Sequence, residues 1–237
     1  MLFIGKIMSD ITIKKRFKTE KVKTAKNRKI SSTRWLQRQL NDTYVQEAKN
    51  RGYRSRASFK ILEINEKFKI FKKGYKVLDL GSAPGGWSQV ISEKVGSGNI
   101  LAVDILHMEP LAGVKFIQQD FLAPEATDII LEQMDGEKYD VVMSDMASNT
   151  TGDKKLDHLR TIGLVEEALE FSLKILKTGG SFVAKIFQGG AEKDLLDKLK
   201  HNFEIVKHFK PKSSRKDSVE MYVVAKNFKN MDNLCKN

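Results

Sequence analysis

The chain has 237 residues, 41% of them hydrophobic, which is enough apolar side chain for one large α/β domain with a core of its own. A single cysteine, Cys235, excludes an internal disulfide, and the sequence has no run of about 18 apolar residues that would cross a membrane. The net charge of +12 is uneven. Residues 1–30 hold ten Lys/Arg against two Asp/Glu, residues 31–60 hold seven against two, and residues 61–237 hold 25 against 26.

The basic N-terminal segment comes first along the chain. Residues 1–30 have no clear apolar face beyond their first few positions, which argues against a helix lying on a membrane surface. A basic arm on a nearly neutral domain predicts a polyanionic partner, such as a nucleic acid. On composition alone, a solvated tail without a partner and a mitochondrial transit peptide stay open. We predict a flexible basic arm over residues 1–30.

Helical patterns follow the arm, and then strands alternate with helices. Residues 33–52 and 55–71 carry apolar side chains at helical spacing. Short apolar runs predict strands at Val77–Leu80, Ile100–Val103, Val114–Ile117, Tyr139–Ser144, Ser181–Phe187 and Val219–Ala225. Helices are predicted between them, notably at Trp87–Lys94, Leu159–Leu176 and Glu192–His201. This alternation is typical of a mostly parallel sheet with helices on both faces. It predicts a Rossmann-like domain over residues 31–226 and a tail over 227–237.

Acidic residues mark the ends of the first four predicted strands: Asp79, Asp104, Asp120 and Asp145. One aspartate at a strand end is ordinary turn chemistry, but four in succession are harder to assign to turns alone. In open α/β sheets, ligands bind beyond the carboxyl ends of the strands. We therefore expect the functional site at this edge.

The turn after the first strand reads Gly81-Ser-Ala-Pro-Gly-Gly86. It lacks the lysine of a P-loop, and Pro84 removes a backbone donor that a phosphate would use. Such a turn suits a ligand without phosphates, such as S-adenosylmethionine, with Asp104 accepting the ribose hydroxyls and Asp120 the adenine amine. Phe121 is expected to flank the ring. On the glycines alone, a dinucleotide-dependent oxidoreductase fits equally well.

Other motifs separate these alternatives. "DLGSAPGGWSQV", "YRSRASFK", "MSDMASN", "SFVAKIFQGG" and "SSRKDSVEMYVVA" together resemble the FtsJ family of ribosomal RNA 2′-O-ribose methyltransferases. The resemblance covers about Ser31 to Ala225, and "SSTRWL" is similar to members that act on bacterial large-subunit (23S) rRNA. It implies a methyltransferase fold with a final antiparallel strand, S-adenosylmethionine as cofactor, and methylation of a uridine 2′-oxygen of rRNA in the cytoplasm. The partner expected is rRNA, within the large ribosomal subunit, with neither a membrane nor an obligate protein partner. Transfer RNA or another structured RNA is the alternative substrate.

The resemblance also implies the site residues. The family's catalytic set falls on Lys60, Asp145, Lys185 and Glu220. Its cofactor contacts fall on Gly85, Trp87, Asp104, Asp120 and Asp145, and no metal is implied. One departure is visible: the family usually has proline after "MSDMA", where this chain has Ser148. The shape of the loop after Asp145 is therefore open.

The chemistry of the catalytic set can be argued from the residues themselves. A ribose hydroxyl needs a base, and a lysine serves as one only as the neutral amine, which burial and a nearby like charge favour. Lys185 lies in the apolar run "FVAKIF" and Lys60 would be the like charge, whereas Asp145 favours the ammonium. Taken alone, Lys185 is better interpreted as a solvent-facing lysine on an edge strand than as a catalytic base. An RNA-binding protein without catalysis also remains open.

Arginines and aromatics are interleaved in the N-terminal part of the domain. Trp35, Tyr44 and Tyr53 lie among several arginines, of which Arg51, Arg54 and Arg56 stand closest to Lys60. We expect these arginines to hold RNA phosphates, and the aromatics to serve as core residues, as stacking surfaces for bases, or as both.

Overall fold

The computed structural model describes residues 20–22, 29–148, 151–188 and 193–229. Its seven-stranded sheet has the order β3-β2-β1-β4-β5-β7-β6. Six strands point in the same direction, and β7 alone is antiparallel, to both of its neighbours β5 and β6. The strands are β1 (Val77–Leu80), β2 (Ile100–Asp104), β3 (Val114–Gln118), β4 (Tyr139–Ser144), β5 (Leu176–Phe187), β6 (Phe203–Phe209) and β7 (Glu220–Phe228). The predicted Rossmann-like class and the final antiparallel strand are confirmed.

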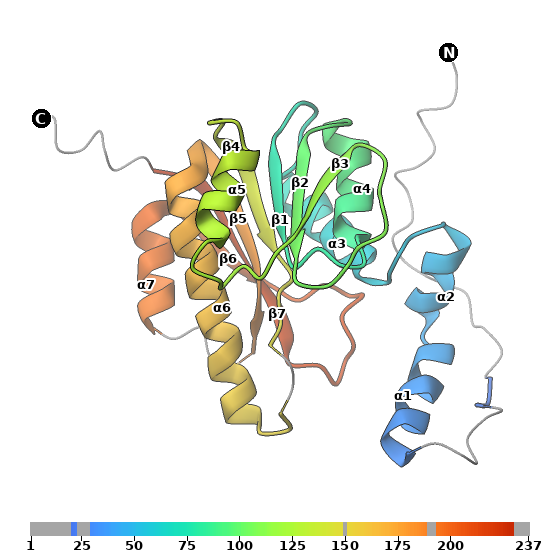
Figure 1. Ribbon diagram of the computed structural model, residues 1–237. Coiled ribbons are helices and arrows are strands. Elements are labelled where there is room, and N and C mark those ends of the chain that lie inside the picture. The colour runs from blue at the N-terminus through green and yellow to red at the C-terminus, as the bar shows by residue number, and fades with distance from the viewer. Residues whose placement is uncertain (1–19, 23–28, 149–150, 189–192, 230–237) are drawn as a thin grey trace, which may run out of the picture.

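Helices cover both faces of the sheet (Figure 1). One face packs on α3 (Ala57–Phe68) and α4 (Gly86–Val95), through a cluster that includes Ile61, Ile64, Trp87 and Ile91. The other face packs on α5 (Ala126–Gln133), α6 (Lys154–Ile175) and α7 (Lys193–Asn202). Buried apolar strands between two helical layers are what a doubly wound sheet requires.

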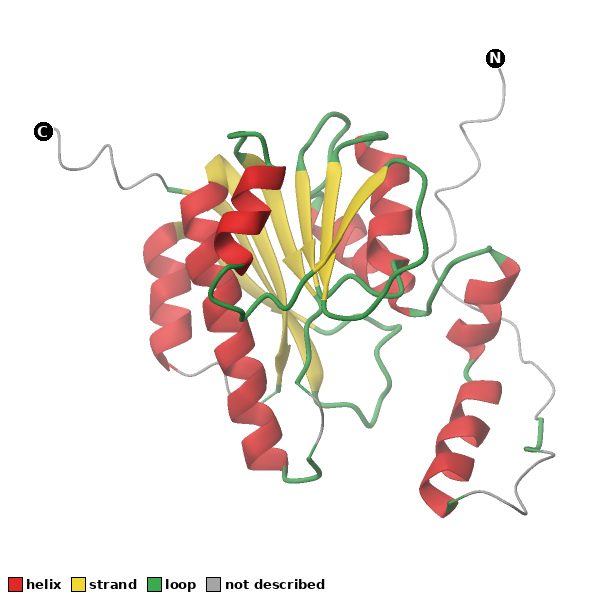
Figure 2. Ribbon diagram, viewed as in Figure 1, coloured by secondary structure: helices red, strands yellow, loops and turns green. Residues whose placement is uncertain are grey.

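The N-terminal helices α1 (Ile30–Leu40) and α2 (Thr43–Asn50) lie beside this sandwich rather than on the sheet (Figure 2). The sequence predicted one continuous helix over 33–52, and this is wrong. The helix breaks because the side chain of Asp42 accepts hydrogen bonds from the backbone N–H groups of Tyr44 and Val45, capping α2 as a separate helix. Of the predicted arm, residues 20–22, 29 and 30 are described, and Ile30 already begins α1. The backbone N–H groups of Glu20 and Val22 donate to the side chains of Asn41 and Gln37, at and near the end of α1.

Two elements and one boundary differ from the sequence prediction. Strand β6 was not expected, and helix α5 had not been given a residue range. Strand β6 lies at the edge of the sheet and mixes polar with apolar residues, so it lacks the continuous apolar run of the central strands. Strand β7 continues to Phe228, two residues into the predicted C-terminal tail. In the described part of the chain, no helix is both long and apolar enough to span a membrane.

Candidate active site

The four strand-end aspartates come together at the carboxyl edge of the parallel strands, as predicted. Asp79 lies inside β1, fully buried, with Ala102 and Met143 as its register partners on the neighbouring strands. Asp104 ends β2, whereas Asp120 and Asp145 stand just after β3 and β4. The strand order thus gathers these four residues at one edge of the sheet, although the first and the last of them, Asp79 and Asp145, are 66 positions apart along the chain.

The glycine turn joins β1 to α4 and packs too closely for side chains. Gly85 has a φ of +96°, and a Cβ there would lie 2.8 Å from the sulfur of Met108. A Cβ on Gly86 would lie 2.2 Å from Ser55 Oγ, at the start of α3. The backbone N–H of Ala83 donates to Asp104 Oδ2 at 2.8 Å, which ties the turn to the end of β2. The glycines are therefore needed for close packing of the turn against α3.

Lys185 is buried, contrary to the solvent-facing alternative. Its strand, β5, lies inside the sheet between β4 and β7, and the residue is 8% exposed. Its Nζ donates to the backbone oxygen of Asp145 at 2.5 Å and lies 3.1 Å from Asp145 Oδ1. Burial opposes ionisation of Asp145, but the charges of Lys185 and Lys60 and two hydrogen bonds outweigh it, so the pKa of Asp145 lies below its ordinary value.

Lys60 and Glu220 form the second pair. Lys60 reaches from α3, and its Nζ lies 2.8 Å from a carboxylate oxygen of Glu220 at the start of β7. Ser214 Oγ donates to Glu220 Oε1 at 2.9 Å. All four predicted catalytic residues are thus engaged in two ion pairs formed across 160 and 40 positions of sequence.

Tyr222 joins the two pairs, and the sequence analysis missed it. It is directly opposite Lys185 in the β5–β7 register, and its hydroxyl donates to Asp145 Oδ1 at 3.0 Å. The Nζ of Lys60 lies 5.8 Å from the centroid of its ring. Burial raises the pKa of Tyr222 well above its ordinary value, and nearby carboxylates add to this, so the hydroxyl stays a donor. Its place two residues after Glu220, on the same face of a strand, was the available signal.

The predicted cofactor residues lie at the expected edge in different settings. Asp104 accepts two backbone N–H groups, from Ala83 and Leu106, each at 2.8 Å. Asp120 is exposed. Trp87 is 3% exposed and donates its ring N–H to the backbone of Ala57, so its side chain belongs to the core. Phe121 is partly exposed and packs edge-on against Phe171 of α6, so its flanking of an adenine ring stays a prediction.

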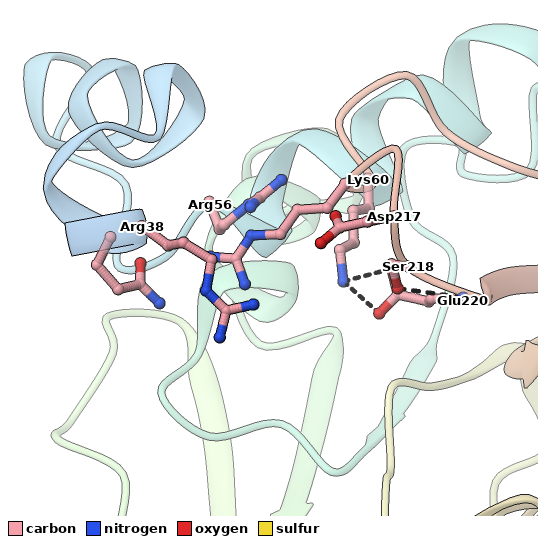
Figure 3. A pocket seen from close by; sticks show the side chains of 8 residues that line it. Arg38, Arg56, Lys60, Asp217, Ser218 and Glu220 are labelled. Carbon is pink, nitrogen blue, oxygen red and sulfur yellow. Dashed lines mark hydrogen bonds and ion pairs between the residues drawn. The ribbon is translucent and has the colours of Figure 1, made fainter. Parts of the chain in front are cut away.

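A positively charged pocket of about 390 Å³ opens beside Lys60 (Figure 3). Its walls come from three segments that are distant in sequence: α1, the start of α3, and the loop between β6 and β7. Four cations and two carboxylates line it: Arg38, Arg56, Lys60, Arg215, Asp217 and Glu220. The Lys60–Glu220 pair forms part of the wall, so an anion bound here would border the catalytic group.

Arg54 and Arg56, the two arginines just before α3, also make hydrogen bonds within the protein, and the expectation that they hold phosphates stays a prediction. The guanidinium of Arg54 donates to the backbone oxygens of Glu109 and Pro110, each at 2.6 Å. Arg56 donates to Asp42 Oδ2 and to the backbone oxygen of Ser213. Tyr44 and Tyr53 both pack edge-on against the buried ring of Phe59, as core residues do.

Comparison with known proteins decides the family. A model described as FtsJ-like methyltransferase matches residues 53–228. The chain belongs to the FtsJ-like methyltransferase family. The match spans the glycine turn and both ion pairs, so the dinucleotide-dependent oxidoreductase is no longer a candidate, and the protein is a methyltransferase.

FtsJ-like relatives match nearly the whole chain. Ribosomal RNA large subunit methyltransferase E of Paramagnetospirillum magneticum is 58% identical over 217 residues, which cover 89% of this chain and 88% of that protein. The protein of the same name from Rickettsia akari is 54% identical, covering 90% and 96%. A solved ribosomal RNA methyltransferase of Plasmodium falciparum has a TM-score of 0.66 and 32% identity, covering 74% of this chain and 98% of that chain.

Asp79 is a buried carboxyl with a raised pKa. Ser88 Oγ donates to its Oδ2 at 2.6 Å, whereas its buried Oδ1 has no hydrogen-bond partner among the described residues. Burial, strengthened by the charges of Asp145 and Asp104 and only partly opposed by Ser88, raises the pKa of Asp79 to about 7. Below its unfolded pKa, near 4, the group is protonated in both states. As pH rises from there to about 7, the unfolded state loses the proton first, so the folded state is progressively disfavoured.

We therefore predict that Asp79→Asn removes a pH dependence of stability. Between pH 5 and pH 8, the free energy of unfolding of the unsubstituted protein should fall by about 3 kcal/mol relative to that of the variant. Urea denaturation at several pH values measures this difference, with Asp197→Asn on the exposed face of α7 as the control. The prediction would be contradicted if the free energy of unfolding changed with pH by the same amount in the unsubstituted protein and in Asp79→Asn.

Proposed function

We propose that this methyltransferase transfers the methyl group of S-adenosylmethionine to the ribose 2′-oxygen of a uridine in large-subunit ribosomal RNA. The observation that carries the proposal is the buried Lys185–Asp145 pair, joined through Tyr222 to Lys60 and Glu220. The names of the relatives support the large subunit as the source of the RNA, and they do not favour transfer RNA. Action in the cytoplasm, where large subunits assemble, belongs to the same proposal.

The polar groups at the carboxyl edge of the sheet fit S-adenosylmethionine. Two buried oxygens at the glycine turn, Asp79 Oδ1 and Ser82 Oγ, have no partner among the described residues, and a ligand with hydrogen-bond donors would satisfy them. Asp79 suits an ammonium group, and Asp104 has oxygens that can accept further bonds from ribose hydroxyls. Ile105 and Leu122, beside Asp104 and Asp120, are 61% and 55% exposed and offer apolar surface to an adenine. Gly85 and Trp87 would contribute through their backbones.

The bound cofactor supplies an electrophilic methyl group, and the protein's residues handle the nucleophile. We assign to Lys185 the removal of the 2′-hydroxyl proton; its ammonium, which Asp145 stabilises, first releases a proton to solvent, and the resulting amine takes the hydroxyl proton. Asp145 orients Lys185 through its backbone and carboxylate oxygens, and Tyr222 fixes that carboxylate. Lys60 and Glu220 hold the sugar from the side of the basic pocket. Correct alignment of the two reactants supplies much of the rate.

Methyl transfer from tritiated S-adenosylmethionine tests the function directly. Naked rRNA, isolated large subunits and transfer RNA are offered in parallel, and the modified position is mapped. We expect label on a uridine 2′-oxygen of large-subunit rRNA. Label on transfer RNA alone would overturn the choice of substrate, and binding of rRNA without any label would indicate an RNA-binding protein that lacks catalysis.

Removing the proposed base should abolish chemistry while leaving the cofactor site intact. Lys185→Ala should lower the single-turnover rate at least about a hundredfold, because general bases contribute at least that much. Cofactor affinity, measured by calorimetry, should stay nearly unchanged. Near-normal methylation by this variant would remove Lys185 from the mechanism. Lys177→Ala, at the exposed start of the same strand, is the matched control.

Asp104 should matter for cofactor affinity. We predict that Asp104→Ala weakens binding of S-adenosylmethionine by about 1–3 kcal/mol, the usual cost of losing such an acceptor. Calorimetry measures this, and Asp104→Asn is informative because the amide retains one acceptor oxygen and should lose less. Unchanged affinity in both variants would mean that the ribose is held elsewhere.

The basic arm should act at long range. Residues 1–19 hold five Lys/Arg against one Asp and lie outside the described residues. Deleting them should slow association with rRNA at low salt and flatten the salt dependence of binding, while single-turnover chemistry on saturating substrate stays nearly intact. An arm of scrambled order and equal charge should restore association. A loss of single-turnover rate on deletion would instead make the arm part of the site.

A further inference from the structure

The loop between β6 and β7, residues 210–219, carries much of the wall around Lys60 and Glu220. It supplies Arg215, Asp217 and Ser218 to the basic pocket, and Ser214 donates its hydroxyl to Glu220 Oε1 at 2.9 Å. A loop of this length without regular structure needs fixed contacts if it is to hold a hydroxyl within hydrogen-bond distance of a carboxylate.

Glu63 provides such a contact from inside the protein. It is 6% exposed, and its carboxylate accepts the backbone N–H groups of Lys212, at Oε2, and of Ser213, at Oε1 and 3.1 Å. These bonds join positions 149 and 150 residues apart. A buried carboxylate is costly unless its oxygens are satisfied, so the two bonds hold Glu63 and the base of the loop together.

The position of Glu63 on α3 links this anchor to the catalytic pair. Lys60 and Glu63 are three residues apart, so they lie on the same face of the helix. That face therefore holds the loop at two places: at its base, through Glu63, and at its far end, where Lys60 meets Glu220. Arg56, one turn before Lys60, adds a bond to the backbone oxygen of Ser213.

We propose that Glu63 is a positioning residue for methyl transfer: by fixing the base of the 210–219 loop to α3, it sets Ser214 against Glu220 and so holds the Lys60–Glu220 pair in place. This inference rests on the proposed function, because it concerns the geometry of the same catalytic set. Glu63 itself touches neither substrate nor cofactor in this proposal.

A double-mutant cycle on single-turnover methylation tests the inference. Glu63→Gln keeps the size of the side chain but leaves one acceptor oxygen and an NH₂ group facing two N–H donors, which loosens the base of the loop. We expect the single-turnover rate to fall by about tenfold, since misplaced groups lose alignment. The Ser214→Ala substitution should lower the single-turnover rate several-fold. Because both changes act on one contact, the double variant should lose no more than Glu63→Gln alone.

Three comparisons separate positioning from general support of the fold. Glu66→Gln, an exposed glutamate on the same helix, should behave like the unsubstituted protein. Glu63→Asp, which keeps both acceptor oxygens, should recover part of the lost rate. Affinity for S-adenosylmethionine should change less than about twofold in Glu63→Gln, because the glycine turn is held by other contacts.

The outcomes distinguish this inference from the proposed function. If the unsubstituted protein transfers no methyl group to rRNA, the proposed function fails. If it does transfer a methyl group, any of three results overturns the inference. The first is a single-turnover rate of Glu63→Gln equal to that of the unsubstituted protein. The second is that the rate losses of Glu63→Gln and Ser214→Ala multiply in the double variant. The third is that Glu63→Gln loses as much affinity for S-adenosylmethionine as it loses in rate. Each of these would show that Glu63 does not act through Ser214 on Glu220.

Discussion

The burial of Lys185 in an interior strand is the constraint on which the rest of the site depends. An ammonium removed from water costs several kcal/mol unless a partner compensates it. Asp145 compensates with both its carboxylate and its backbone oxygen, and Tyr222 holds that carboxylate in turn. The compensating carboxylate must therefore lie close to β5. Asp145 does so because it comes just after β4, which is the neighbour of β5 in the sheet. Removing any one of the three leaves a buried polar group without its partner, so the cluster is also a structural requirement of the sheet.

The antiparallel direction of β7 is what completes the cluster. The parallel strands deliver their last residues to the carboxyl edge, whereas β7 delivers its first ones, Glu220 and Tyr222, to that edge. A parallel strand in this place would carry both residues to the opposite edge, far from Asp145. Because β7 pairs with β5 over seven positions, from Ser181 with Lys226 to Phe187 with Glu220, its register is fixed by many hydrogen bonds. Direction and register together set Tyr222 opposite Lys185.

The N-terminal basic residues divide into two kinds that composition does not separate. Arg54 donates hydrogen bonds to the backbone oxygens of Glu109 and Pro110. Arg56 donates to Asp42 and to the backbone oxygen of Ser213, in the loop between β6 and β7. Both arginines therefore support segments on which the site is built. Asp42 also accepts from Arg215, and thereby ties α2 to the loop between β6 and β7. Arg38 comes from α1 and lines the basic pocket, and Arg56 belongs to both kinds because it lines that pocket too. A count of charges treats these residues alike, whereas the structure shows which of them support the fold and which line the pocket.

The sequence by itself determined the class of fold and pointed to the carboxyl edge of the sheet, because these depend on local features: apolar runs, a glycine turn and aspartates at strand ends. The motifs of a known family added four catalytic positions, which stay a prediction. Only the tertiary structure decided which side chains meet. Tyr222 looked like one more apolar-strand residue until the β5–β7 register set it opposite Lys185. Glu63 was not singled out in the sequence, and its role became visible only from the bonds that its carboxylate accepts from residues 212 and 213. The contacts of Arg54 and Arg56 were hidden for the same reason, whereas the break at Asp42 rests on a local helix cap and β6 is an edge strand without a continuous apolar run. Contacts between residues 14 to 160 positions apart are set by packing and strand order, and the sequence around each residue carries no signal of its distant partner.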